Sequence, residues 1–324
     1  ITRNGDLITK MYLKASLTDN TTDGSGTSVA AWVDNLGYSM IKSVELQIGG
    51  TKIDKHYGTW LNIWAELTRN ADYDESKNAI VGGSGNTSTS LELFVPLEFF
   101  CCRNDGLALP LIALQYHDVR VEFEFEPVEN VSSNAGASLD DASLLVDYIY
   151  LDSEERKRFA QASHEYLIEQ LQYTGAESIN GTTGKYRLNF NHPCKEIVWV
   201  ATECASDTSQ SRSNNFGDST TKAAGSNPVN SAQLQLNGHD RMSVQSGKYF
   251  NHVQTLAHNH SPSEGVNVYS FALNPEEHQP SGTCNFSRID NAQLNIEFTG
   301  DYSTNGKVHI FATSYNVLRI MSGM

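Results

Sequence analysis

A short strand-and-turn pattern occurs twice in the chain, and it constrains the fold more than any other sequence feature. Residues 44–50 read Val-Glu-Leu-Gln-Ile-Gly-Gly, and residues 232–238, 188 positions later, read Ala-Gln-Leu-Gln-Leu-Asn-Gly. A second pair follows at residues 119–125 and 292–298, which alternate apolar and polar side chains and are 173 positions apart. Because the two separations differ only by the length of a loop, we infer two similar β-rich units in one chain.

The length and the strand pattern agree with two all-β units. The chain has 324 residues, about twice the usual size of one domain, and two units of roughly 150 residues can each bury a core. Stretches rich in β-branched and aromatic residues recur between polar turns, a spacing typical of sandwiches and barrels. We predict few helices: an amphipathic one over residues 57–67 and a second one that Asp152 or Ser153 caps.

The charge and the cysteines of the chain exclude two kinds of protein. The formal net charge is −15, whereas a surface that binds nucleic acid needs an excess of lysine and arginine, so we expect no direct contact with nucleic acid. The five cysteines do not make a disulfide framework. Cys101 and Cys102 are adjacent on a predicted strand and would point to opposite faces, so we expect buried thiols and folding in a reducing compartment.

Residue types that carry chemistry in enzymes form no convincing site in this sequence. His252, His258 and His260 lack a companion cysteine pair or a His-Glu helix motif, so we expect a solvated loop and no metal ion. The acidic pairs at residues 140–141 and 276–277 are typical of surface charge, since adjacency does not give the geometry of a glycosidase. We therefore expect no enzymatic activity, no catalytic residues and no cofactor.

Asparagines in the Asn-X-Ser/Thr pattern are the candidate modification sites. Six matches occur, and four of them fall in predicted loops or turns, where a glycan can be accommodated. These four candidate glycosylation sites are Asn20, Asn86, Asn130 and Asn180. Because neither end of the chain reads as a secretory signal, we expect most of the six matches to arise by chance.

One segment resembles the signature of a known family. Residues 278–290, His-Gln-Pro-Ser-Gly-Thr-Cys-Asn-Phe-Ser-Arg-Ile-Asp, are similar to a signature of the major capsid proteins of nucleocytoplasmic large DNA viruses, the group that contains phycodnaviruses and iridoviruses. The resemblance continues, in chain order, through nearly the whole sequence. It includes residues 48–50, 53–58, 95–97, 102–104, 107–117, 147–152, 164–170, 188–193 and 316–324.

The resemblance implies an all-β double jelly roll, that is, two consecutive eight-stranded jelly-roll sandwiches with a few short helices. It implies a first jelly roll in residues 1–152, a connector helix in residues 153–163 and a second jelly roll in residues 164–324. It also implies that the opening strand of the first jelly roll precedes Ile1 and that a short glycine-rich tail follows Met324. The duplicated pattern is what this architecture requires.

The family resemblance further implies a structural role in a virion capsid. Three chains would form a homotrimeric, pseudo-hexagonal capsomer, and neighbouring capsomers would tile an icosahedral shell by self-assembly. The implied partners are minor capsid proteins and an internal viral membrane beneath the shell, with assembly in the host cell cytoplasm. We expect the long polar segments at residues 72–90, 129–141 and 205–230 to form loops on the outward surface.

A carbohydrate-binding or carbohydrate-active jelly-roll protein is the alternative interpretation, because such sandwiches are common in lectins and glycan-processing enzymes. This alternative predicts an aromatic platform with converging carboxylates or a metal ion, and the sequence shows neither clearly. A stable trimer favours the capsid interpretation, whereas a monomer that binds sugar favours the alternative.

Overall fold

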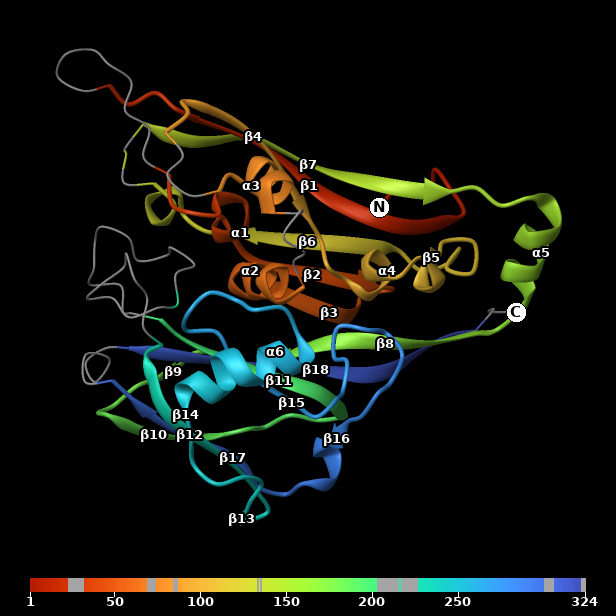
Figure 1. Ribbon diagram of the computed structural model, residues 1–324. Coiled ribbons are helices and arrows are strands. Elements are labelled where there is room, and N and C mark those ends of the chain that lie inside the picture. The colour runs from red at the N-terminus through yellow and green to blue at the C-terminus, as the bar shows by residue number, and fades with distance from the viewer. Residues whose placement is uncertain are drawn as a thin grey trace. The chain divides into compact units, whose positions relative to one another are not determined.

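The fold consists of two compact units, each rich in antiparallel strands (Figure 1). The computed structural model describes residues 1–22, 32–68, 74–83, 87–132, 134, 136–202, 216, 227–299 and 306–321. The first unit contains Ile1–Asn62, Ala71–Gln170 and Asn316–Met324, and the second contains Ile63–Asn70 and Leu171–Tyr315. Strands account for 46% of the chain and helices for 20%, so the all-β expectation is confirmed.

The first unit contains two antiparallel sheets. In one sheet, β1 pairs with β7 along one edge and with β4 and β5 along the other; in the second sheet, β2 lies between β3 and β6. The strands are β1 (Leu7–Asp19), β2 (Ile41–Ile48), β3 (Thr51–Tyr57), β4 (Ser90–Pro96), β5 (Leu109–Pro110), β6 (Val119–Phe125) and β7 (Ala137–Ile149). Alternate residues of β1, namely Met11, Leu13, Ala15 and Leu17, are buried, which gives this sheet one core-facing side.

The second unit repeats this plan with more strands, two of which, β8 and β18, extend into residues 164–170 and 316–320 of the first unit. One sheet has the order β15-β11-β18-β8, with β9 and β16 added at its margins, and the other has the order β10-β17-β12-β13, with β14 also on β12. The strands are β8 (His164–Tyr173), β9 (Glu177–Ser178), β10 (Thr183–Arg187), β11 (Pro193–Thr202), β12 (Val229–Leu236), β13 (His239–Asp240), β14 (Gln245–Ser246), β15 (Asn267–Ser270), β16 (Cys284–Asn285), β17 (Ala292–Phe298) and β18 (Lys307–Ile320). Its core is centred on Trp199 and Phe250, whose rings meet edge to face.

The duplicated sequence pattern forms the same structure in both units. β2 and β12 each end in a two-residue turn with positive φ at both positions, Gly49 and Gly50 in one and Asn237 and Gly238 in the other. This conformation suits glycine and asparagine and matches the twist of a hairpin. The second repeated pattern supplies the neighbouring strand each time, because β2 pairs with β6 and β12 pairs with β17. The inferred duplication is therefore confirmed.

The two units differ at two sheet edges. In the second unit, β18 lies between β8 and β11, and β17 lies between β10 and β12. In the first unit, the equivalent strands β7 and β6 each pair with a strand on one side only, as far as the described residues extend. The described part of the first unit thus contains no counterpart of β8 or β10.

The helices are short, and two of them were predicted. α2 (Gly58–Leu67) matches the predicted amphipathic helix, and α5 (Ser153–Gln161) has Asp152 as its N-cap, accepting from the backbone N–H groups of Glu154 and Glu155. The others are α1 (Leu36–Ser39), α3 (Asp74–Val81), α4 (Phe100–Arg103), η2 (Asp105–Leu107), η3 (Val128–Asn130), the π-helix η5 (Tyr249–Val253), α6 (Gln254–His258) and η6 (Phe286–Arg288). Across the described ranges, no helix is long and apolar enough to cross a membrane.

Some local predictions were wrong. Cys101 and Cys102 lie in α4 and not on a strand, because β4 ends at Pro96 and the chain then turns into a helical segment. α3 forms inside the polar segment at residues 72–90, which was predicted as a loop. Likewise β7 begins at Ala137, within the predicted loop at residues 129–141, because the long strand β1 pairs with it as far as Asp19.

Candidate protein–protein interfaces

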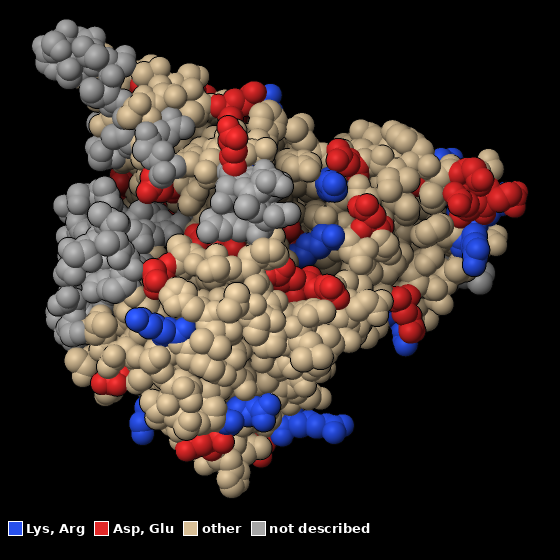
Figure 2. Space-filling model, in the orientation of Figure 1, with Lys and Arg blue, Asp and Glu red and all other residues tan. Residues whose placement is uncertain are grey.

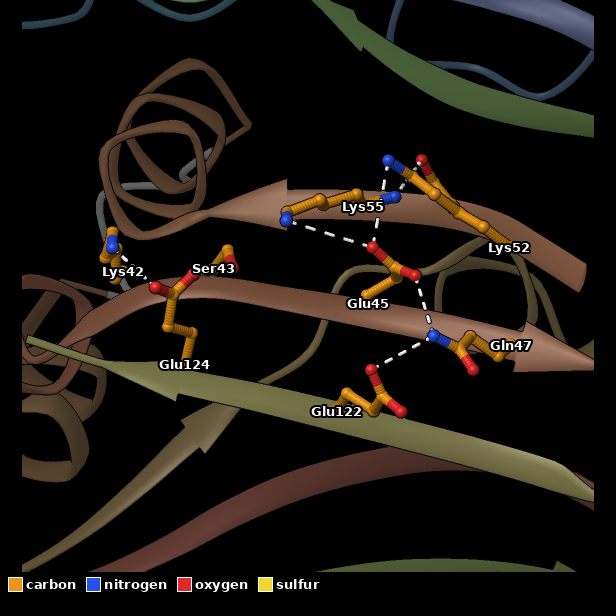
Figure 3. Close-up of polar contacts among 9 residues, drawn as sticks. Lys42, Ser43, Glu45, Gln47, Lys52, Lys55, Glu122 and Glu124 are labelled. Carbon is orange, nitrogen blue, oxygen red and sulfur yellow. Dashed lines mark hydrogen bonds and ion pairs between the residues drawn. The ribbon is translucent and has the colours of Figure 1, made fainter. Parts of the chain in front are cut away.

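The outer face of the β3-β2-β6 sheet carries a network of charged side chains (Figure 3). Glu45 on β2 lies 3.7 Å from the ammonium group of Lys52 and 3.8 Å from that of Lys55, both on β3. The amide of Gln47 donates to Glu45 at 2.8 Å and to Glu122 on β6 at 3.0 Å. The network therefore connects all three strands.

A second group of polar contacts lies on the same face of the sheet, near the start of β2 (Figure 3). Glu124 on β6 accepts from the ammonium of Lys42 at 2.5 Å and from the hydroxyl of Ser43 at 3.2 Å. The hydrogen bond from Lys42 lowers the pKa of Glu124. Exposed ion pairs of this kind contribute little to stability. The positive charges of the lysines labelled in Figure 3 balance the negative charges of the labelled glutamates. This face is therefore polar without a net charge from these residues, and they form no basic patch that could bind nucleic acid.

The outer face of the β4-β1-β7 sheet is apolar at one end. The register sets Pro96 on β4, Tyr12 on β1 and Leu145 on β7 in one row across the three strands. The adjacent row contains Phe94 on β4 beside Lys14 on β1. We call the four apolar residues Tyr12, Phe94, Pro96 and Leu145 the β1 face. Leu145 is 42% exposed, and the other three are half-buried, so this face is incompletely covered.

Polar rows border the β1 face on the same sheet. The Lys14 ammonium lies 5.6 Å from the centre of the Phe94 ring and 2.6 Å from a Glu92 carboxylate oxygen. The next row places Ser16 of β1 between Glu92 and Asp141. The sheet thus changes from apolar to polar along its length, which is the pattern of an interface centre with a polar rim.

A second exposed apolar surface lies on the helix pair η5–α6 of the second unit. Phe250 and Thr255 point into the unit and are buried, whereas Val253 is 52% exposed and Leu256 is 85% exposed. Leu273 is also exposed, and its carbonyl oxygen lies 2.9 Å from Nδ1 of His258 at the end of α6. We call Val253, Leu256 and Leu273 the α6 face. Figure 2 shows tan surface over α6, that is, residues other than Lys, Arg, Asp and Glu, with charged side chains at its margins.

Buried polar contacts hold this helix pair in place. The Asn251 amide donates to the carbonyl oxygens of Ser263 and Val266, at 3.1 and 2.7 Å. The Thr255 hydroxyl donates to the carbonyl oxygen of Asn251 at 2.5 Å. The exposed side of the helix pair is therefore fixed by its buried side, as a preorganised docking surface requires.

A buried carboxyl group lies on β11 near the end of α6. Glu196 is fully buried and accepts from the Asn259 amide at 3.4 Å and from the Thr313 hydroxyl at 3.3 Å. Burial raises the pKa of Glu196 to about 7, although neighbouring Lys195 acts to lower it. Burial also raises the pKa of Glu276, which pairs with His260 at 3.4 Å. Glu276 is thus a half-buried, paired group, and not the plain surface charge expected from the sequence.

The three histidines do not come together. His252 pairs with Glu264 at 3.1 Å, His258 contacts a backbone carbonyl, and His260 pairs with Glu276. His252 and His258 lie in helices, and not in the solvated loop that we expected. Among the residues with described positions, no group of three or more His, Cys, Asp or Glu could hold a metal ion.

The candidate glycosylation sites differ in accessibility. Asn20 and Asn180 are exposed. Asn130 is half-buried, and its amide nitrogen donates to Glu126 at 3.3 Å, which competes with attachment of a glycan. Asn86 lies outside the described residues. Glycosylation at these asparagines stays a prediction.

Comparison with known proteins identifies the family. The family model for large eukaryotic DNA virus major capsid proteins matches residues 155–324, and the model for the major capsid protein N-terminus matches residues 1–152. The major capsid protein of Pyramimonas orientalis virus is 46% identical over 356 aligned residues, covering 100% of this chain and 83% of that relative. The major capsid protein of Paramecium bursaria Chlorella virus 1 is 39% identical over 385 residues, covering 100% and 85%.

Solved structures agree with this result. VP54 of PBCV-1 matches with a TM-score of 0.84 at 35% identity, covering 100% of this chain and 90% of that chain. The Faustovirus major capsid protein, with a TM-score of 0.83 at 12% identity, covers 99% and 87% and shows the same fold. The fold is therefore that of a double jelly-roll capsid protein. The chain belongs to the family of major capsid proteins of large eukaryotic DNA viruses and is a structural component of the virion capsid.

Two outcomes follow for the sequence-based interpretation. The capsid interpretation is confirmed, and none of the matched families and relatives supports the carbohydrate-binding alternative. The α6 face was missed, because Val253 and Leu256 look like core residues in the sequence. Their spacing gave no signal either, because Phe250, Val253 and Leu256 read as one apolar stripe of a helix, although only Phe250 is buried.

Proposed function

We propose that three copies of this chain form a pseudo-hexagonal capsomer and that such capsomers tile an icosahedral shell. The observation that carries this proposal is the repeated hairpin and sheet plan of the two units, β2 with β6 and β12 with β17. Three chains with two similar units each supply six similar lobes, which fit a hexagonal lattice. No enzymatic activity is part of this role.

The oligomeric state tests this proposal directly. Size-exclusion chromatography with light scattering should give three times the chain mass of 35.8 kDa. Negative-stain images of the same fraction should show particles with six-lobed outlines. A protein that stays monomeric at micromolar concentration, or that forms dimers, would contradict the capsomer.

The proposal extends to the other partners of the shell. We infer that minor capsid proteins and an internal membrane lie beneath the shell, and that assembly takes place in the host cytoplasm. The net charge of −15 supports neighbours other than the genome, since phosphate repels an acidic surface. Density for a bilayer directly under the shell, in images of intact particles, would support this arrangement. Direct contact of the shell with nucleic acid would contradict it.

We also propose domain boundaries at residues 1–152 and 164–324, with a connector helix at residues 153–163. The ranges of the two matching family models, 1–152 and 155–324, support this division. Limited proteolysis should cut first near α5, whose residues are mostly exposed. Initial cleavage inside β11 or β18 would contradict the boundaries.

A further inference from the structure

Two cysteines of the second unit face each other across neighbouring strands. β11 pairs with the two-residue strand β16, and the register sets Cys194 directly opposite Cys284. Both cysteines are free thiols. They are 284 − 194 = 90 positions apart in the sequence, so it is the fold that brings them together.

The backbone hydrogen bonds of the two strands set the distance between these cysteines. The N–H of Phe286 donates to the carbonyl oxygen of His192 at 3.1 Å. Hydrogen-bonded and non-hydrogen-bonded pairs alternate along an antiparallel ladder, so Cys194 and Cys284, two positions further along, form a hydrogen-bonded pair. The Cα atoms of such a pair are about 5.5 Å apart, inside the range of about 4.4–6.8 Å that a disulfide spans.

The two cysteine side chains project to the same side of the sheet, as directly opposite residues do. Cys194 belongs to the hydrophobic core cluster of the second unit, and Cys284 packs against that cluster. The hydrogen bonds that the Cys194 thiol donates are long, 3.6 Å to the carbonyl oxygen of Asn191 and 3.7 Å to that of His192. Exchanging them for a covalent bond between the two sulfur atoms therefore sacrifices little.

A second pair of described cysteines, Cys101 and Cys102, lacks this geometry. Their Sγ atoms lie 4.0 Å apart. The residues are adjacent, however, and a trans peptide holds their Cα atoms about 3.8 Å apart, below the range of a disulfide. A bond between these two sulfur atoms would distort α4. Proximity of sulfur atoms is thus insufficient, and the opposed positions on two strands distinguish Cys194 and Cys284.

We propose that Cys194 and Cys284 form a reversible cross-strand disulfide when the folded chain meets a small-molecule disulfide such as oxidised glutathione. The inference is independent of the trimer, because both cysteines lie in the second unit of one chain. Opposed Cβ atoms are about 4.5–5.5 Å apart in a sheet, and a disulfide needs about 3.5–4.5 Å, so closing the bond strains it. Strained disulfides are easily reduced, and excess thiol should therefore reopen this one.

The reaction is a pair of thiol–disulfide exchanges. Cys284 reacts first, because it is half-buried whereas Cys194 is fully buried. Its thiolate attacks one sulfur of the small disulfide, and the other sulfur leaves as a thiolate that takes up a proton. Cys194 then loses its proton and attacks Sγ of Cys284, which releases the second small thiol. Two electrons pass from the cysteines to the small disulfide, and two molecules of the small thiol are formed.

Burial keeps both cysteines reduced until an oxidant is present for long enough. It raises the pKa of Cys194 to about 12, and the neighbouring Cys284 acts in the same direction. Burial also raises the pKa of Cys284, although Arg241 acts to lower it. Protonated thiols are weak nucleophiles, so the exchange is slow at neutral pH. The chain can therefore fold with both thiols free and acquire the disulfide afterwards.

The disulfide would strengthen a thin attachment in the sheet. β16 is held on β11 by two residue pairs, and Pro193 in one of them has no N–H to donate. A bond across this pair also closes a loop of about 90 residues, and long loops gain most from a cross-link. We expect oxidation to slow the opening of β16 by at least about tenfold, a part of the gain for a loop of this length because strain reduces it.

The first test maps the disulfide in the unchanged chain. Folded protein is incubated with oxidised glutathione at mildly alkaline pH, and the remaining thiols are blocked with N-ethylmaleimide in denaturant. The monomer band of a non-reducing gel is then digested with trypsin, which places Cys194 in the peptide 188–195 and Cys284 in the peptide 249–288, apart from the other three cysteines. We expect these two peptides to be linked, and the link to disappear when the folded protein is returned to excess reduced glutathione.

Three results of this mapping would overturn the proposal. The first is that both thiols stay free, or that Cys284 keeps a glutathione group that Cys194 does not displace. The second is a link that forms only when the chain is oxidised in denaturant, since the folded strands would then not position the sulfur atoms. The third is a link that survives excess reduced glutathione in the folded protein, which would contradict reversibility. The peptide 78–103, with Cys101 and Cys102, should carry two maleimide groups throughout.

The second test measures what the bond does to the sheet. Amide hydrogen exchange of residues 284–288 should be at least about tenfold slower in the oxidised chain than in the reduced chain. Cys284→Ser, a small change at a half-buried site, is the matched control, and oxidised glutathione should leave its exchange unchanged. Equal exchange in the oxidised and reduced forms of the unchanged chain would show that the bond does not hold β16 in place.

Discussion

At the scale of single residues, Glu196 makes the stability of the second unit depend on pH. Its pKa is raised from 4.5 to about 7 by burial, while Lys195, Asn259, Glu276 and Thr313 are the groups that face it. The folded chain therefore holds a proton that the unfolded chain releases above pH 4.5. The contribution of Glu196 to stability is therefore largest below that pH and falls as the pH rises to about 7, by roughly 3 kcal/mol.

The substitution Glu196→Gln tests this expectation, because it keeps the shape and removes the ionisation. Amide hydrogen exchange of β11, followed by mass spectrometry at pH 5 and pH 8 with correction for intrinsic rates, measures the local stability. We expect protection in the unchanged chain to fall between these pH values and to fall much less in the variant. Glu155→Gln, on the exposed helix α5, is the control and should retain the full fall. An equal pH response in Glu196→Gln and the unchanged chain would contradict the assignment to Glu196.

The sequence could not predict the burial of Glu196. A Lys-Glu pair within a strand normally places one charge on the wet face of a sheet. Here β11 has neighbouring strands along both edges, β15 and β18, and both of its faces are covered. By contrast, the clean alternation of β6 was predicted correctly: Arg120, Glu122 and Glu124 are exposed. The alternation of apolar and polar residues is visible in a sequence. Whether the second face of a strand is buried depends on which other segments of the folded chain pack against it.

At the scale of elements, α5 depends on its N-cap. The Asp152 carboxylate accepts from the N–H groups of Glu154 at 2.8 Å and Glu155 at 3.0 Å. Arg156 in the same helix donates to Asp6 at 2.9 Å, which lowers the pKa of Asp6. Since α5 has no buried residues, its order rests on such polar contacts.

We predict that Asp152→Ala destabilises α5 by about 1 kcal/mol, the usual cost of losing an N-cap. Hydrogen exchange of residues 153–161 should become about fivefold faster, while exchange in β1 and β11 stays unchanged. Asp152→Asn is the matched control, because asparagine caps helices about as well as aspartate does. Unchanged exchange in Asp152→Ala would mean that the Arg156–Asp6 contact alone orders the helix.

The elements that the sequence predicted are those whose signal is local. α2 was predicted from the spacing of Trp60 and Trp64, and α5 from its capping residue. The first part of β7 was missed, because residues 139–143 show no apolar alternation and become a strand only by pairing with β1, as in Leu17 with Leu139. α4 was missed because four residues are too few for a helical period to show.

At the scale of the whole molecule, the sequence predicted the family and the double jelly roll, because duplication and an ordered series of motifs extend over the chain. It could not predict the two uncovered faces. Leu145 and Leu256 are aliphatic residues like those of the core, and only their exposure in the folded chain distinguishes them. An interface between copies is a property of the assembly, and a strand or helix pattern describes only the chain.

The net charge of the molecule makes a final prediction about assembly. Two chains of charge −15 repel through the solvent, and salt screens this repulsion over a Debye length that shortens from about 20 Å near 20 mM to about 6 Å near 300 mM. If apolar faces hold the capsomer together, added salt should therefore tighten the trimer. An interface held by ion pairs between chains would respond in the opposite direction. Sedimentation equilibrium at 20 and 300 mM NaCl distinguishes the two, and the double variant Glu154→Gln with Glu155→Gln, which removes two exposed negative charges from α5, should reduce the salt response without reversing it.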